Sequence, residues 1–149
     1  MFNFETVHPI ADAAFEKELI DRQVTERMAD APVSPELNSD VLDLVVSVFR
    51  DLRTGMTADG ASVAVPNSVM STAEAVNVTH AAALEAAYLD DGTMTAGHIA
   101  RQLGGTVFKD DPEDARKLRA YVDQIAKPRG RTSRTWSAFY KSAKDGLRD

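Results

Sequence analysis

The sequence has 149 residues, of which 44% are hydrophobic and 27% are charged. This is the composition of a folded globular domain and not of a disordered chain. The absence of cysteine excludes disulfide bonds, thiolate zinc sites and cysteine nucleophiles, and it makes the reducing cytoplasm the expected location. The apolar stretches are shorter than the roughly 20 residues of a membrane-spanning helix, so we expect no contact with a membrane.

The charges are distributed unevenly along the chain. Residues 127–149 contain seven Lys or Arg residues and two acids, a net charge of +5, whereas residues 1–126 have a net charge of −11. Such a basic tail could bind the acidic body of its own chain, an acidic partner or a phosphate backbone.

The first 28 residues predict a short strand followed by a helix. Phe2, Phe4 and Val7 alternate with polar residues, as in a strand that needs a neighbour to pair with. Asp12 is a candidate N-cap for the helix that follows. Its predicted apolar face consists of Phe15, Leu19, Ile20, Val24 and Met28.

A second helix and a hairpin are expected next. Ser34 followed by Pro35 is a typical helix start, and the apolar residues after it are spaced as on one helix face up to about Arg53. In residues 54–68, Asp59-Gly60 lies between short alternating runs, which predicts a β-hairpin with Gly60 at positive φ. We expect this hairpin to lie on the surface without a chemical role.

The stretch Ser71-Thr-Ala-Glu74 is the clearest helix start in the sequence. It has the pattern of a capping box, in which the first side chain binds the backbone of the fourth residue and the reverse. The helix that follows is rich in Ala, so neighbouring helices can approach it closely, and we expect it at the centre of a helical bundle.

Three further helices are predicted toward the C-terminus. Thr95 would cap the first, which Gly104-Gly105 weakens or kinks. Asp111 and Pro112 would begin the next, and the sequence Lys-Pro-Arg-Gly-Arg at 127–131 would end it. The last helix carries Trp136, Phe139 and Tyr140 on one face, which favours docking on a core.

A search for catalytic motifs finds none. The sequence has no Gly-Lys-Ser/Thr phosphate loop, no His-Glu-x-x-His zinc motif and no Gly-x-Ser-x-Gly nucleophile turn. His8, His80 and His98 lack the spacing of metal ligands, and helix capping explains the acids at 110–114 better than cation binding does. We therefore predict no catalytic residue, no metal site and no cofactor held by this chain.

The order of these elements resembles the lid domain of MoxR-type AAA+ ATPases, the small helical domain that follows the ATP-binding domain. FNFETVHPIADAAFEKELI resembles the last strand of the large domain, a Pro-containing hinge and the first lid helix. In the family, an Asp-Arg-Phe with an arginine finger precedes the hinge; Met1 stands at the Arg position here, and Phe2 matches the Phe. PNSVMSTAEAVNVTHAAALEAAYLDDGTMTAGHIARQL resembles the sensor-2 helix and the short helix after it.

The resemblance implies a fold that is mostly α, a small lid-like bundle with a short hairpin and a C-terminal helical extension. Residues 1–10 would form the strand end and hinge, 11–110 the lid, and 111–149 an extension with the basic tail. It also implies that an ATP-binding domain precedes the chain in an ATP-hydrolysing parent that binds ATP and Mg, whereas this chain alone would not hydrolyse ATP.

The resemblance assigns roles to particular residues. Val7, His8 and Pro9 would form the hinge. The residues facing the nucleotide would be Ile10, Ser71, Thr72, Ala73 and Glu74. The family has an Arg that touches the γ-phosphate where this sequence has Ala73, so γ-phosphate sensing must come from elsewhere or be absent.

The implied partners are the chain's own ATP-binding domain, other subunits of a hexameric ring, and client proteins with von Willebrand factor A domains that a chaperone-like activity would remodel. The partner surface would include Arg129, Arg131, Arg134 and Trp136. An alternative is a free-standing helical interaction module whose basic and aromatic tail binds an acidic partner or, less expected, nucleic acid.

Overall fold

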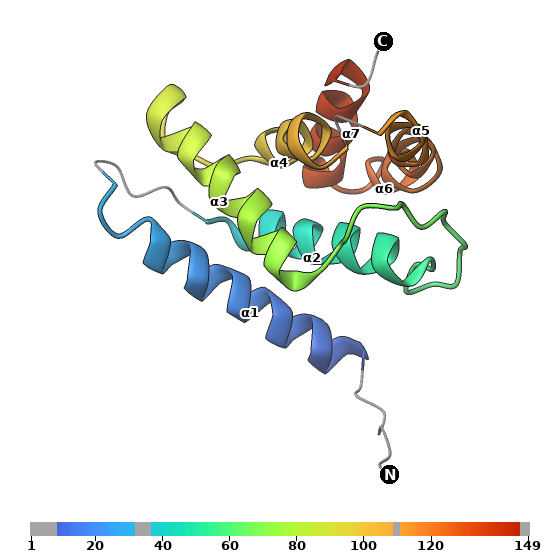
Figure 1. Cartoon of the computed structure of the whole chain (residues 1–149), viewed down its shortest axis with the longest axis horizontal. Coiled ribbons are helices and arrows are strands. Elements are labelled where there is room, and N and C mark those ends of the chain that lie inside the picture. The colour runs from blue at the N-terminus through green and yellow to red at the C-terminus, as the bar shows by residue number, and fades with distance from the viewer. Residues whose placement is uncertain (1–8, 32–36, 109–110, 147–149) are drawn as a thin grey trace.

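The computed structural model describes residues 9–31, 37–108 and 111–146, and these residues form a bundle of helices (Figure 1). The longer helices are α1 (Pro9–Arg27), α2 (Ser39–Thr54), α3 (Thr72–Leu89), α5 (Pro112–Tyr121) and α7 (Arg134–Gly146). Shorter ones are α4 (Ala96–Gln102) and α6 (Lys127–Arg129), and two π-helical turns, Leu103–Val107 and Val122–Ala126, continue α4 and α5. Among the described residues, no helix combines the length and the hydropathy needed to span a membrane.

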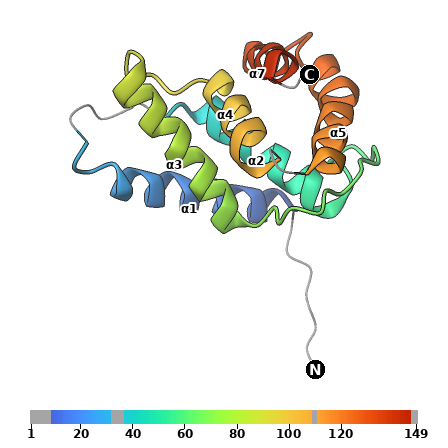
Figure 2. The ribbon, with the colours of Figure 1, turned by 45° about the horizontal axis from the view of Figure 1, so that its top comes forward.

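The bundle has α2 and α3 in its middle. Figures 1 and 2 show α1 on one side of this pair and α4, α5 and α7 on the other side. The Ala-rich α3 contacts α1, α2 and α4, because its buried face is built mainly from small side chains such as Ala75, Ala82, Ala83 and Ala86. The predicted central position of this helix is therefore confirmed.

One hydrophobic core joins the predicted lid and the predicted extension. It contains Leu44 and Phe49 of α2 together with Leu118 of α5, Val122 of the second π-helical turn and Phe139 of α7. Phe139 is fully buried, and Trp136 and Tyr140 pack against the core, which confirms that the last helix docks on the bundle. The division at residue 110 is thus not visible as a gap in the core, and it stays a prediction about function.

The observed helix starts differ from two of the predicted ones. The helix expected after Asp12 begins at Pro9, so Asp12 lies in its first turn and its carboxylate binds Arg50 instead of capping. The helix expected after Ser34 begins at Ser39, where the Asn38 side chain accepts from two backbone N–H groups. Residues 1–8, with the predicted strand, and residues 32–36 lie outside the described part of the chain.

The predicted β-hairpin is wrong. Within the described residues there is no strand, and the segment contains one isolated antiparallel bridge, between Met56 and Ser62. Gly60 does adopt a positive φ of 95°. The second half of the segment is bound by side chains from the C-terminal helices. Lys117 Nζ donates to the Val65 carbonyl and Gln124 Nε2 donates to the Ser62 carbonyl, each at 3.0 Å. Backbone hydrogen bonds across the turn run from the Thr57 N–H to the Ala61 carbonyl and from the Val63 N–H to the Gly55 carbonyl, and they form a bridge rather than a strand ladder.

The C-terminal helices are weakened and ended at the predicted positions. The Gly104-Gly105 pair lies inside the π-helical turn Leu103–Val107, so the helix changes its winding there and does not stop. The helix that starts at Pro112 continues through a second π-helical turn and α6 and ends at Gly130. Pro128 is the second residue of α6 and lies directly after the π-helical turn.

Candidate functional site

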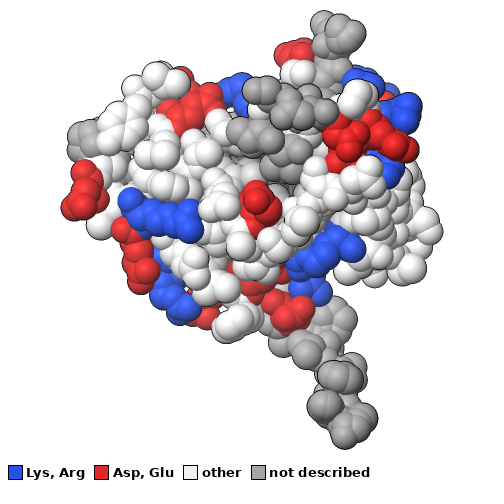
Figure 3. Space-filling model, in the orientation of Figure 1, with Lys and Arg blue, Asp and Glu red and all other residues white. Residues whose placement is uncertain are grey.

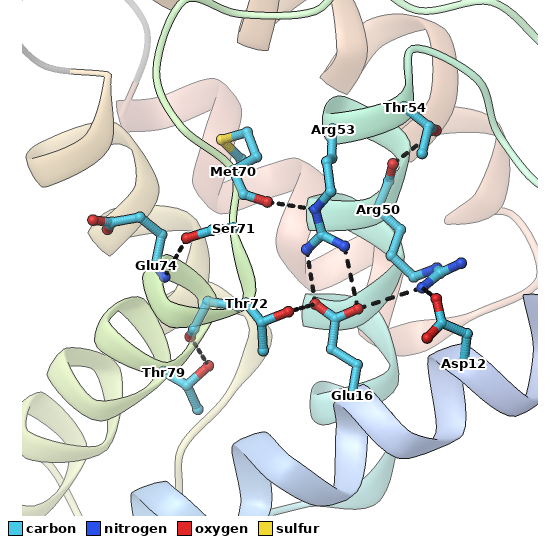
Figure 4. Close-up of polar contacts among 11 residues, drawn as sticks. Asp12, Glu16, Arg50, Arg53, Thr54, Met70, Ser71, Thr72, Glu74 and Thr79 are labelled. Carbon is cyan, nitrogen blue, oxygen red and sulfur yellow. Dashed lines mark hydrogen bonds and ion pairs between the residues drawn. The ribbon is translucent and has the colours of Figure 1, made fainter. Parts of the chain in front are cut away.

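The first turn of α3, with its N-cap, contains four of the five residues that the family resemblance assigned to the nucleotide. Ser71 is the N-cap, and its hydroxyl accepts a 3.1 Å hydrogen bond from the Glu74 N–H. Figure 4 shows the Glu74 carboxylate directed away from Ser71, so only the Ser71 half of the predicted capping box is present. Ala73 is exposed in the same turn. The turn offers backbone N–H groups and the positive end of the helix dipole.

A buried carboxylate from α1 lies beside this turn. The Glu16 side chain is 5% exposed and accepts from the Thr72 hydroxyl at 3.0 Å. Arg53 of α2 donates to both Glu16 oxygens, from Nη2 at 2.8 Å and from Nη1 at 3.4 Å. The Arg53 Nε also donates to the Met70 carbonyl at 2.7 Å. Residues from three helices therefore meet at one carboxylate (Figure 4).

Arg50, one helical turn before Arg53, extends this ion-pair network to the start of α1. Its Nη1 donates to Asp12 at 2.7 Å and reaches Glu16 at 3.5 Å. The Asp12 hydrogen bond, which outweighs the cost of burial, raises the pKa of Arg50 above its already high value. Its guanidinium is therefore a permanent positive charge at this end of the domain.

An open cavity of about 550 Å³ lies next to Arg50. Its lining comes from α1, α2 and the segment after α2, and includes Ala13, Val46, Arg50, Met56 and Thr57. Ala13 is one helical turn from Pro9, where the described part of the chain begins. The cavity therefore lies near the start of α1.

The ion-pair network contains the site residues that our sequence analysis missed. We assigned Phe15 to the buried face of α1, but Phe15 is 62% exposed. Ile20, Val24 and Met28 are buried as predicted, and Glu16, four residues before Ile20, continues their stripe in place of Phe15. The position of Glu16 in line with apolar residues was the available sequence signal for a buried ion pair. A carboxylate is buried only where cations or hydrogen-bond donors from other elements bind it.

The residues proposed as a partner surface have different environments. Arg129 Nη1 binds Asp51 at 3.2 Å, and its guanidinium lies 4.7 Å from the centre of the Trp136 ring. Trp136 in turn contacts Phe139 edge-to-face. Arg131 and Arg134 are exposed. Two of the four candidates are therefore engaged inside the chain, and two remain on its surface.

A second carboxylate joins the loop before α3 to the C-terminal helices. Asp114 of α5 is fully buried and accepts from the N–H groups of Asn67 and Ser68 at 2.7 and 2.8 Å, and from the Ser68 hydroxyl at 2.6 Å. Burial alone would raise the pKa of Asp114, but these hydrogen bonds together lower it below its ordinary value. Because the same loop leads into Ser71, the C-terminal helices fix the position of the candidate site.

His98 lies in a cluster with the Glu85 and Asp90 carboxylates that has the composition of a metal site. Its Nδ1 accepts the Thr95 N–H at 2.9 Å, and its Nε2 lies 2.6 Å from Asp90. These contacts fix a neutral ring that donates from Nε2. A metal on Nε2 would require the proton on Nδ1, where the Thr95 N–H already points. This His98 tautomer forms a helix cap with Thr95, the predicted N-cap of α4.

Of the other predicted site residues, Val7 and His8 lie outside the described part of the chain. Pro9 and Ile10 are the first two residues of α1, so the hinge would lie directly before or at this helix start.

Comparison with known proteins identifies the family. The family model for the C-terminal domain of YehL-like AAA+ ATPases matches residues 14–147. The sequence is 35% identical over 141 residues to the Escherichia coli (strain K12) protein "Uncharacterized protein YehL", in a match that covers 95% of this chain and 38% of that protein. No solved structure matches the chain significantly. On the evidence of the family match, this chain belongs to the family of YehL-like AAA+ ATPase C-terminal domains.

Proposed function

We propose that this chain is the C-terminal lid of an ATP-hydrolysing AAA+ protein of the MoxR type. The observation that carries the proposal is the match of the family model to nearly the whole chain, residues 14–147. The chain spans about two fifths of the length of the matched E. coli protein, which leaves room in such a parent for an ATP-binding domain before the lid. That domain would hold ATP and Mg, and the lid alone would hydrolyse nothing.

The arrangement of helices suits this role. The N-terminal half of α1 and the first turn of α3 lie side by side, because Glu16 and Thr72 are in contact there. In the parent protein, Val7, His8 and Pro9 would form the hinge, and Ile10 and the turn from Ser71 to Glu74 would face the nucleotide. With Ala at position 73, the turn would offer the phosphates its N–H groups and helix dipole in place of an arginine.

The lid would transmit nucleotide-dependent motion. Rotation about the hinge would move each lid relative to its ATP-binding domain and thereby move subunits within a hexameric ring. The expected work is chaperone-like remodelling of cytoplasmic partners, among them proteins with von Willebrand factor A domains. Arg131 and Arg134, which are exposed, are the better candidates for partner contacts, since Arg129 and Trp136 pack against each other.

The test is to assay ATP hydrolysis by the parent protein with Mg, with and without the lid. We expect hydrolysis by the whole protein, a large loss when residues 9–149 are deleted, and none from the 149-residue chain alone. A parent protein that neither binds nor hydrolyses ATP would overturn the proposal. Oligonucleotide binding by the 149-residue chain that weakens with salt and disappears on removal of residues 127–149 would favour the interaction module instead.

A further inference from the structure

Several kinds of contact hold α1 on the bundle: apolar packing, exposed polar pairs, the part-buried Asp12–Arg50 ion pair and the contacts of Glu16. Ile20 and Val24 are fully buried, but apolar contacts are non-directional and set the exact register of a helix only loosely. The Lys17–Asp43 ion pair and the Arg27–Asn77 hydrogen bond are exposed, where such contacts are weak.

The Glu16 contacts differ from these in burial and direction. The 5% exposed carboxylate binds Arg53 through both oxygens and accepts from the Thr72 hydroxyl. Charge-assisted hydrogen bonds in a buried setting are strong and require a defined geometry. A shift of α1 that breaks them would leave a buried charge without partners, which is costly.

We propose that Glu16 is a positioning residue that makes α1 and the first turn of α3 move as one body when the parent protein binds nucleotide. This inference rests on the proposed function. Thr72 directly follows the N-cap Ser71, and Arg53 also holds the Met70 carbonyl just before it. A displacement that enters through α1 is therefore passed to the whole segment from Met70 to Thr72.

The absence of cysteine from this chain allows the motion to be measured with two site-specific spin labels. Ala14→Cys on α1 and Leu84→Cys on α3 are exposed positions, in a parent protein whose other cysteines, if any, are replaced. With wild-type Glu16, we expect the distance between the labels to be the same with and without ATP. With Glu16→Gln, which keeps the shape and removes the charge, we expect ATP to shift or broaden the distance distribution. We also expect ATP turnover to fall about tenfold or more, because small misplacements of catalytic elements have effects of that size.

Glu85→Gln is the matched control. It is the same substitution on a partly buried helix residue, and it also removes an arginine pair, here with Arg101 at 2.9 Å. Glu85 lies in the second half of α3. A general loss of stability would affect both variants alike, whereas the proposal requires the ATP-dependent distance change in Glu16→Gln alone.

Thr72→Val is the second variant, for use if Glu16→Gln does not fold. It removes the donor to Glu16 with little change of shape, and the same ATP-dependent distance change is expected. Unchanged distances in the folded variants, in a parent protein that hydrolyses ATP, would overturn this inference and leave the proposed function standing. A wild-type parent without ATP binding or hydrolysis would overturn both.

Discussion

The Tyr121 hydroxyl donates a 2.7 Å hydrogen bond to Asp51 inside the core, joining residues that are 70 positions apart in the sequence. Tyr121 comes from the predicted extension and Asp51 from α2 of the predicted lid. Arg129 approaches the same Asp51 oxygen. The Asp51 contacts therefore hold the C-terminal helices to the lid by specific polar bonds as well as by apolar packing.

Replacing Tyr121 by Phe removes the hydroxyl and leaves the Asp51 carboxylate with one donor fewer. We expect the free energy of unfolding to fall by about 1–3 kcal/mol, the range for leaving a buried polar group without its partner. Urea unfolding of the 149-residue chain measures it. Tyr88→Phe, at an exposed tyrosine, is the control and should leave the midpoint almost unchanged; equal midpoints for the two variants would contradict the prediction.

The shifted pKa of Asp51 is expected to make the free energy of unfolding depend on pH. Burial raises the pKa of Asp51, although the Tyr121 and Arg129 bonds oppose this effect. The folded state therefore binds a proton more tightly than the unfolded state does. The stabilisation is fully present below the ordinary pKa of about 4 and is lost as the pH rises through the raised value.

Measuring the free energy of unfolding between pH 3 and pH 8 tests this sign for Asp51. The difference between wild type and Asp51→Asn should change across the window above about pH 4, in the direction of a wild type that loses stability relative to the variant as the pH rises. A constant difference would show that Asp51 has the same pKa in both states.

The pKa of Asp114 is shifted in the opposite direction to that of Asp51, so its effect on stability has the opposite pH dependence. The Ser68 and Asn67 hydrogen bonds outweigh the effect of burial and lower the pKa of Asp114, so its stabilisation is present above the ordinary pKa and is lost as the pH falls through the lowered value. At neutral pH, Asp114→Asn should destabilise the domain by about 2–3 kcal/mol, since hydrogen bonds to a charged group are involved.

The matched control is Glu113→Gln, at the neighbouring, exposed acid. It should change the free energy of unfolding by less than about 0.5 kcal/mol. Thermal unfolding at pH 7 compares the two. Similar losses for both variants would mean that the charge of this turn matters and the buried bonds do not.

Gly130 is required by the close approach of α7. A Cβ at Gly130 would lie 3.0 Å from the Ser137 Cα and 3.2 Å from its backbone N, and backbone atoms cannot move aside alone. Gly130→Ala should therefore destabilise by about 1–3 kcal/mol. At Gly104 nothing lies within 4 Å of an added Cβ, so Gly104→Ala should leave stability unchanged or raise it by up to about 1 kcal/mol. Urea unfolding midpoints of the two variants test this prediction. A loss of stability in Gly104→Ala would contradict it.

Local sequence patterns correctly predicted features that depend on local interactions, such as helix N-caps. Ser71, Thr95 and Asp111 are N-caps as expected, because a cap is formed within a few residues of the chain. The resemblance to a known order of elements supplied the AAA+ assignment, which periodicity and capping alone could not give.

The features that the sequence did not reveal depend on contacts between distant segments. Glu16 is buried because Arg53 and Thr72, 37 and 56 positions away, satisfy its carboxylate. The segment predicted as a hairpin is bound by the side chains of Lys117 and Gln124, which lie 52 and 62 positions from the carbonyls that they contact. The position of Glu16 in an apolar stripe was a signal for its burial, but a single sequence does not name the distant residues that bind it or those that bind residues 54–68.

The Asp114 bonds have a consequence for synthesis of the protein. Asp114 is synthesised 46 or more residues after Asn67 and Ser68, and Tyr121 is synthesised 70 residues after Asp51. On the ribosome, α2 and α3 emerge well before the residues that complete their polar contacts. The polar contacts of Asp51 and of the loop before α3 can therefore form only after α5 has left the ribosomal exit tunnel.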